Sequence, residues 1–242
     1  MKNKITYSYV RTQSPLGDYR YNTFIGHFFS ARISPIFTIL FIKLGVIPNI
    51  VTLLMIGSGF FGALLFSFES VWIKLIGFGF IALWFVLDCS DGEVARITKQ
   101  FSTMGKELDY VAHTLNHPFF ILSYGYSLFL MEVNEVTLFV SLSAILILDL
   151  MHRGVMGLNL IYQIKTEPES DDCTKTRLSF IKYFISNLAL LPNFVTFLPL
   201  IIILSNVFSI DLFSVYIYLT ALCYLVVVPR ALIILTMRFV RS

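Results

Sequence analysis

The sequence predicts an all-α, polytopic membrane protein with six transmembrane helices, preceded by an N-terminal amphipathic helix that lies in the membrane interface. The first observation is composition: 57% of the 242 residues are hydrophobic and 14% are charged, whereas soluble domains have about 45–50% and about 25%. The second is a series of apolar segments of about 20 residues, the length that crosses about 30 Å of hydrocarbon. The third is the distribution of Lys and Arg between these segments. A single membrane domain over residues 1–242 is the simplest organisation.

The region before the first predicted span has two parts. Residues 1–22 are polar and contain no apolar stretch of the kind found in signal peptides, so we expect no cleavable signal. Residues 23–45 carry apolar side chains at helical spacing, interrupted by Arg32, Pro35 and Lys43. This pattern predicts an amphipathic helix lying in the interface. A spanning helix is the alternative, but it would disturb the charge distribution described below.

The predicted transmembrane bundle occupies residues 48–238. Its six spans are expected at about 49–68, 72–98, 106–131, 137–164, 193–208 and 210–237. The fifth span is the shortest, and its start is uncertain because residues 178–191 are also fairly apolar.

Basic residues fall mainly on one side of this bundle. Lys74 is the only basic residue between the first two spans, and residues 132–135 and 205–211 contain none. The opposite connections and the C-terminus hold Arg96, Lys99, Lys106, Lys165, Lys175, Arg177, Lys182, Arg238 and Arg241. The positive-inside rule therefore predicts a multi-pass protein of the plasma or inner cell membrane with both termini in the cytoplasm. The net charge of +3 is too small to indicate nucleic-acid binding.

Acidic residues gather where the second and third spans meet the cytoplasm. Asp88 and Asp91 are three residues apart on one predicted helix, and Asp109 and His113 are four apart on the next, so each pair shares a helix face. A short loop joins these helices, which should pack antiparallel and bring the carboxylates together. Carboxylates at membrane depth are usually functional, and three in one place would repel each other unless cations lay between them. Oxygen ligands favour Mg²⁺ or Mn²⁺.

Two further residues suggest that this site handles phosphate. Gly92 removes a side chain next to the aspartates, so that a ligand can approach the backbone. Arg96 lies one turn later, and its planar fork of donors suits phosphate oxygens. Hard cations together with an arginine are suited to stabilising a diphosphate in a transition state.

The segment from 88 to 113 resembles the signature D-x2-D-G-x2-A-R-x8-G-x3-D-x3-D of the CDP-alcohol phosphotransferases, also called CDP-alcohol phosphatidyltransferases. Seven fixed positions agree with correct spacing: Asp88, Asp91, Gly92, Ala95, Arg96, Gly105 and Asp109. The six-span layout and the preceding amphipathic helix are also similar to this family, so the resemblance covers most of the chain.

The resemblance implies an enzyme in which an acceptor hydroxyl displaces CMP from a CDP-linked alcohol and forms a phosphodiester. It implies that Asp88, Asp91 and Asp109 bind two divalent ions, Mg²⁺ or Mn²⁺. The residues implied to contact the nucleotide or diphosphate are Asn49, Thr52, Gly92, Arg96, Ser102 and Gly105. The donor is then CDP-diacylglycerol or a CDP-linked polyol or amino alcohol, and the product is a phospholipid or a cell-surface lipid or glycan. A homodimer is expected by analogy.

The sequence departs from the signature at its last position. The family has a fourth Asp there, thought to deprotonate the acceptor hydroxyl and to help hold metal, whereas this chain has His113. Imidazole is a competent general base, with an unperturbed pKa of about 6.5, and it also ligates metals. Three interpretations stay open: His113 is a variant base, or mainly a metal ligand, or the mark of an inactive member that acts as an interaction partner. A transporter is a less favoured alternative, because the acidic residues cluster at one membrane face.

Three weaker patterns complete the sequence analysis. The Pro-Asn-x-x-Thr sequence at 48–52 recurs as Pro-Asn-x-x-Thr at 192–196. We favour ordinary helix-start chemistry, with Asn or Thr as caps, over a true structural repeat, and a binding role for the first copy stays open. Asp149 and Arg153 are spaced for an intrahelical ion pair, although Arg153 is also a candidate contact for an anionic acceptor, as is Arg230. The cysteines, Cys89, Cys173 and Cys223, are expected to be free thiols.

Overall fold

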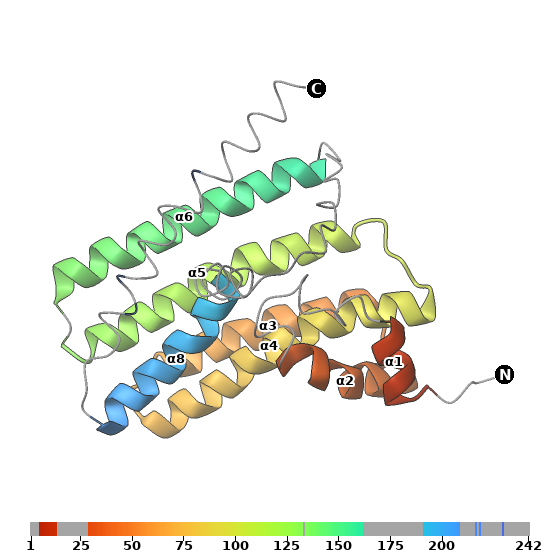
Figure 1. Ribbon diagram of the computed structural model, residues 1–242, viewed down its shortest axis with the longest axis horizontal. Helices are drawn as coiled ribbons and strands as arrows, with labels where there is room; N and C mark the ends of the chain where they lie inside the picture. The colour runs from red at the N-terminus through yellow and green to blue at the C-terminus, as the bar shows by residue number, and fades with distance from the viewer. Residues whose placement is uncertain are drawn as a thin grey trace, which may run out of the picture.

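The computed structural model describes residues 5–13, 29–132, 134–161 and 191–208, together with residues 216, 218 and 229. The regular elements in this part of the chain are helices, which confirms the predicted all-α class (Figure 1). They are α1 (Tyr7–Gln13), α2 (Ala31–Leu44), α3 (Pro48–Phe66), α4 (Val71–Thr98), α5 (Gly105–Phe129), α6 (Glu135–Ile161) and α8 (Leu191–Phe208).

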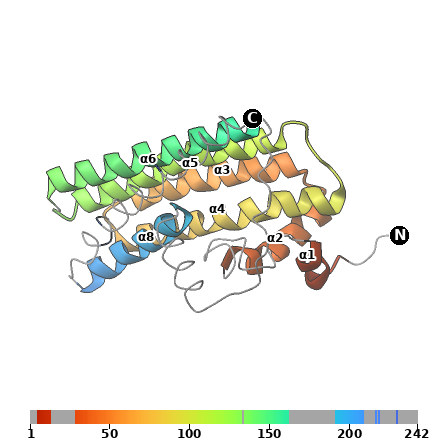
Figure 2. The same cartoon turned by 45° about the horizontal axis from the view of Figure 1, so that its top comes forward.

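The helices form a bundle around the α3–α4 pair. Consecutive long helices α3, α4, α5 and α6 are joined by short connections, and α3 packs against both α4 and α5. In Figures 1 and 2, α6 lies along the outer side of α5, while α8 lies on the side of α4 and α5. The short α2 packs on the C-terminal half of α4 and α1 packs on α2. This arrangement places the end of α4 and the start of α5 next to the start of α3.

The observed helices agree closely with the predicted segments. The predicted spans 49–68, 72–98, 106–131 and 137–164 correspond to α3, α4, α5 and α6. The fifth predicted span corresponds to α8, which begins at Leu191. Among the described helices, α3 and α4 are long and apolar enough to cross a membrane, and large side chains such as Phe61 and Trp72 are exposed on them. The predicted span 210–237 lies almost wholly outside the described residues.

Local signals explain where the helices around the site begin and end. Pro48 opens α3, since proline is tolerated in a first helical turn. The residue before it, Ile47, has an extended backbone. Gly45 ends α2 with a left-handed φ of 70°. Lys99 ends α4 with a φ of 58°, so the chain turns there into the short loop that leads to Gly105 and α5.

Two glycines allow α3 and α4 to pack backbone against backbone. A Cβ atom at Gly77 would lie 2.6 Å from the backbone nitrogen of Phe66, and one at Gly62 would lie 3.0 Å from that of Ile81. Both contacts are with backbone atoms, and a Cβ at Gly62 would also lie 2.8 Å from Ile81 Cγ1, so a side chain at either position would push the helices apart. Small residues of this kind let helices approach closely in a membrane. The close approach lies at the end of α3 and the start of α4, next to the turn that joins them.

A buried carboxylate holds α2 against α4. Glu93 has no exposed surface, and its two oxygens accept hydrogen bonds from the hydroxyls of Ser34 at 2.9 Å and Thr38 at 2.6 Å. Ser90 adds a bond to the Ser34 carbonyl at 3.3 Å. The structure describes part of the predicted interfacial segment 23–45. In that part, polar contacts with Glu93, the residue next to Gly92, hold α2 against the bundle.

Candidate metal and nucleotide site

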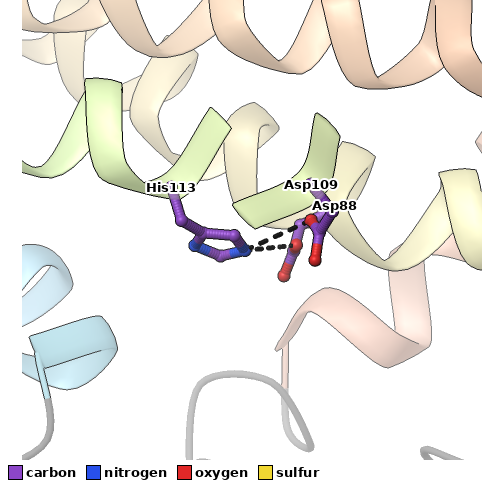
Figure 3. A group of neighbouring side chains, drawn as sticks. All are labelled: Asp88, Asp109 and His113. Carbon is purple, nitrogen blue, oxygen red and sulfur yellow. Dashed lines mark hydrogen bonds and ion pairs between the residues drawn. The ribbon is translucent and has the colours of Figure 1, made fainter. Parts of the chain in front are cut away.

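Three predicted ligands converge between α4 and α5. Figure 3 shows Asp88 on α4 facing Asp109 and His113 on α5. His113 Nε2 lies 2.9 Å from Asp88 Oδ1 and 3.5 Å from Asp109 Oδ1. The three ligand atoms lie within 4.8 Å of one another. The antiparallel packing predicted from the short loop thus brings residues 25 positions apart into one cluster.

The donor set fits a divalent cation. Asp109 Oδ1 is buried, and apart from the long contact with His113 Nε2 at 3.5 Å it has no polar partner among the described residues, an arrangement that is unfavourable for a carboxylate oxygen unless a cation or donor binds it. Two carboxylates and an imidazole nitrogen around one point supply that coordination, because carboxylate oxygens suit Mg²⁺ and Mn²⁺ and imidazole suits transition metals. The cluster therefore has the chemistry of a metal site, although its side chains are 22% to 45% exposed.

Asp91 lies beside this cluster and outside the group of three. One of its oxygens accepts a hydrogen bond from the Thr52 hydroxyl at 2.8 Å, and the other accepts one from the backbone N–H of Gly92. Both bonds orient the carboxylate toward an adjacent pocket that Asp109 also lines. Asp109 thus stands between the three-residue cluster and the pocket.

The pocket has a volume of about 440 Å³ and lies between the start of α3, the end of α4 and the start of α5. Binding sites for small molecules typically measure about 300–1,000 Å³. All six residues expected to contact nucleotide or diphosphate line it: Asn49, Thr52, Gly92, Arg96, Ser102 and Gly105. Residues far apart in the sequence are therefore assembled on one concave surface next to the cluster.

The cap explanation for Asn49 and Thr52 is wrong in the structure. The residue preceding α3 is Ile47, and no side chain caps the helix. Asn49 Nδ2 donates to Ser102 Oγ at 3.2 Å, and Thr52 reaches Asp91 on α4 while also bonding weakly to its own helix at the Pro48 carbonyl, 3.4 Å away. Both side chains make contacts between elements, because their positions on the first turn face the end of α4 and the loop after it.

Gly92 and Arg96 are directly coupled. A Cβ atom at Gly92 would lie 3.0 Å from Arg96 Nη1 and 3.5 Å from Nη2. The missing side chain therefore makes room for the guanidinium as well as for a ligand. This places five N–H donors of a permanent cation at the wall of the pocket.

The model of the CDP-alcohol phosphatidyltransferase family matches residues 45–204. The chain belongs to this family. Membership implies a membrane-bound CDP-alcohol phosphotransferase of lipid biosynthesis that takes a CDP-alcohol donor, in a class that generally depends on divalent metal. No curated protein matches the chain.

A second polar group extends the phosphatidyltransferase site into the bundle. The predicted intrahelical pair is confirmed, with Arg153 Nε 3.2 Å from Asp149 Oδ2. The same carboxylate oxygen lies 3.3 Å from His117 Nδ1, and His117 Nε2 lies 3.5 Å from His113 Nδ1. Arg153 is only 11% exposed along its side chain.

Sequence reasoning did not assign five residues to the phosphatidyltransferase pocket. Pro48 and Ala95, which belong to the motifs, line it together with Gln100, Phe101 and Lys106. Of these, Lys106 could have been predicted from the sequence, because it is a cation next to Gly105 at the start of α5. The family signature does not include its position. Arg230, the other candidate acceptor contact, lies outside the described residues.

Proposed function

We propose that this phosphatidyltransferase transfers a substituted phosphate group from a CDP-alcohol to an acceptor hydroxyl, releasing CMP, in the synthesis of a phospholipid or of a cell-surface lipid or glycan. The observation that carries the proposal is the placement of the Asp88–Asp109–His113 cluster beside the pocket lined by the signature residues. In the reaction the acceptor oxygen forms a bond to the phosphorus that carries the alcohol, the bond from that phosphorus to CMP breaks, and the hydroxyl proton leaves.

The proposed roles follow the geometry. Asp88, Asp91 and Asp109 would hold two divalent ions, Mg²⁺ or Mn²⁺. When bound, such cations offset the charge that develops on the diphosphate. Arg96 adds a fixed positive charge at the pocket wall. The nucleotide and diphosphate would contact Asn49, Thr52, Gly92, Arg96, Ser102 and Gly105.

His113 is the proposed general base. Its Nε2 lies inside the cluster, 2.9 Å from Asp88 Oδ1, and the cluster adjoins the pocket through Asp109; there His113 would take the proton of the acceptor hydroxyl. The same position also supports a role mainly as a metal ligand. The retention of three carboxylates, Gly92 and Arg96 around a formed pocket favours an active enzyme over an inactive family member that serves as an interaction partner.

The proposal includes six spans, a cytoplasmic site and a homodimer. Arg153 and Arg230 are the proposed contacts for an anionic acceptor. Arg153 is already bonded to Asp149 and His117, so an acceptor there would have to share an ion-paired guanidinium.

A panel of CDP-alcohols tests the function. Membranes containing the protein are incubated with CDP-diacylglycerol, CDP-polyols or CDP-amino alcohols and candidate acceptors, and CMP release is measured with Mg²⁺, with Mn²⁺ and with EDTA. We expect cation-dependent release from one donor class, abolished by Asp109→Asn. The absence of release from every donor would favour the non-catalytic partner or the transporter.

A further inference from the structure

Trp84 lies one helical turn before Asp88 on the same face of α4 and packs against the histidine of the cluster. Its ring centroid lies 4.8 Å from that of His113, with the two ring planes at 86°, and 5.7 Å from that of His117. Asp88 Oδ1 lies 2.9 Å from Nε2 of the same His113 ring. One face of α4 therefore supplies His113 with a carboxylate at Nε2 and an indole against the ring.

The indole is itself held in place. Trp84 is 1% exposed and packs edge-on against Phe85 and Phe120, with ring centroids 4.9 Å and 5.5 Å away. Its N–H donates a hydrogen bond to Asn116 Oδ1 at 3.2 Å. A buried indole held by two rings and a hydrogen bond has little freedom to change rotamer, because protein interiors are close-packed. The ring of Trp84 thus gives His113 a fixed surface.

Asn116 connects this indole to α3. It is 1% exposed, and its Nδ2 donates a hydrogen bond to the Ile56 carbonyl at 3.0 Å. Gly59 leaves room for the connection, since a Cβ atom there would lie 2.7 Å from Asn116 Cγ and 2.8 Å from Trp84 Cδ1. Helix α3 also carries Thr52 in the pocket. The position of the indole is therefore tied to a helix that forms the pocket wall.

An imidazole at position 113 depends on such a surface more than the signature aspartate would. A carboxylate has two equivalent oxygens, so it still presents an acceptor after a rotation. The two nitrogens of an imidazole point in different directions, and the torsion that turns the ring has only a broad intrinsic preference. Rotation would take Nε2 away from Asp88 and Asp109. The side chain of His113 is 22% exposed, and its Nδ1 contact with His117 is long at 3.5 Å, so these features hold the ring only weakly.

We propose that Trp84, held by Asn116, is a positioning residue that keeps the imidazole of His113 turned with Nε2 toward the carboxylate cluster. The role applies to His113 as a general base and as a metal ligand, because both require Nε2 to point there. The inference rests on the proposed function, since it concerns the same site. Misplacing a reacting or ligating group commonly lowers rate or affinity by about 10- to 100-fold.

Nuclear magnetic resonance of the histidine rings tests the orientation without metal, nucleotide or turnover. The full-length protein in detergent carries ¹³C at the ε1 carbon of histidine, and the His113 signal is identified by its loss in His113→Asp. We expect one resonance for His113 in the wild type, and a split or broadened one in Trp84→Leu, because the ring can then turn. Phe66→Leu is the matched control. It also removes a buried aromatic ring, one that packs against Tyr124 at the end of α3, and it should leave the His113 signal single.

Turnover in two backgrounds separates positioning from packing. At saturating donor and cation, Trp84→Leu should lower kcat for CMP release about 10-fold or more in the protein with His113. In the His113→Asp background, where no imidazole has to be oriented, the same change should cost less than about threefold, and such non-additivity indicates that the two side chains act together. The KM for the CDP-alcohol should change little, because Trp84 does not line the pocket.

Trp84→Phe is a milder second variant for the case that Trp84→Leu does not fold. It keeps a buried ring but loses the second ring of the indole and the hydrogen bond to Asn116. We expect it to show the same dependence on the residue at position 113, with a smaller loss of kcat.

Three results would overturn the inference. They are a single sharp His113 resonance in Trp84→Leu, the same broadening in Phe66→Leu, and an equal loss of kcat in the two backgrounds, which would indicate a general packing role. A wild-type protein that released no CMP from any donor would count against the proposed function instead. The resonance of His113 would then decide whether Trp84 holds the ring.

Discussion

At the scale of single residues, the site depends on what surrounds each functional side chain. His113 has carboxylates at one ring nitrogen and a second histidine at the other. An imidazole here differs from the signature aspartate in two respects: it brings no negative charge to the cluster, and its two nitrogens are not equivalent. Substituting His113 therefore tests whether it acts as the general base or has no part in the reaction.

Replacing His113 is expected to remove the proton acceptor. His113→Ala should lower kcat for CMP release by about 10²- to 10⁴-fold, the usual contribution of a general base. His113→Asp restores the family residue and should retain much more activity. Initial rates at saturating donor and cation measure both variants. Unchanged turnover in the Ala variant would remove His113 from the mechanism.

Gly92→Ala should weaken binding of the CDP-alcohol without lowering the stability of the protein. The new methyl group would lie 3.0 Å from Arg96 Nη1, so the guanidinium, the flexible end of its side chain, must move from the pocket wall. Helix stability should not fall, because alanine is about 0.5–1 kcal/mol better than glycine within a helix. We expect a several-fold higher KM for the CDP-alcohol with an unchanged melting temperature.

The control for this substitution is on the same helix. Gly79→Ala adds a methyl group where no atom lies within 4 Å, so it should change neither KM nor folding. A Gly92→Ala enzyme with wild-type KM would show that the position of Arg96 against Gly92 does not matter for binding the donor.

At the scale of elements, the site is assembled by contacts between helices rather than within one. Helix α3 lies along α4 from the glycine contact at Gly62 and Gly77 to the hydrogen bond of Thr52 with Asp91, and the loop after α4 brings Ser102 to Asn49. Glu93 couples α2 to the same stretch of α4. Disturbing α2 should therefore affect the stability of the bundle near the site.

Glu93→Ala tests that coupling. The change leaves the hydroxyls of Ser34 and Thr38 buried without their carboxylate partner, and each unsatisfied group costs about 1–3 kcal/mol. We expect a lower melting temperature in detergent and faster proteolysis of the segment containing α2. Glu107→Ala removes an exposed carboxylate on α5 and should change neither. Wild-type stability in the Glu93 variant would mean that α2 is held by apolar contacts alone.

At the scale of the whole molecule, helices were predictable and most contacts between them were not. Apolar length, Pro48 and Gly45 mark helix limits directly in the sequence, and the spacing of Asp88, Asp109 and His113 places them on facing helices. Contacts such as those of His117 with Asp149 depend on how α5 and α6 rotate against each other. No local pattern records that rotation.

The predicted orientation in the membrane follows from the same bundle. The site and the connection from Lys99 to Met104 lie at one end of α4 and α5, whereas the connection from Leu130 to Asn134 lies at the opposite end of α5. Since basic residues flank only the first connection, the positive-inside rule predicts that it lies in the cytoplasm. Nucleotide donors would then be available on the side of the membrane where the pocket lies.

Single cysteines at the two connections test this orientation. In a variant without native cysteines, Thr103→Cys and Glu132→Cys each place a thiol at an exposed position. A membrane-impermeant maleimide should label Glu132→Cys in intact cells and label Thr103→Cys only after the membrane is opened, because the connections are about 30 Å of hydrocarbon apart. Labelling of Thr103→Cys in intact cells would place the pocket outside, where a cytoplasmic CDP-alcohol could not reach it, and would contradict both the orientation and the proposed donor.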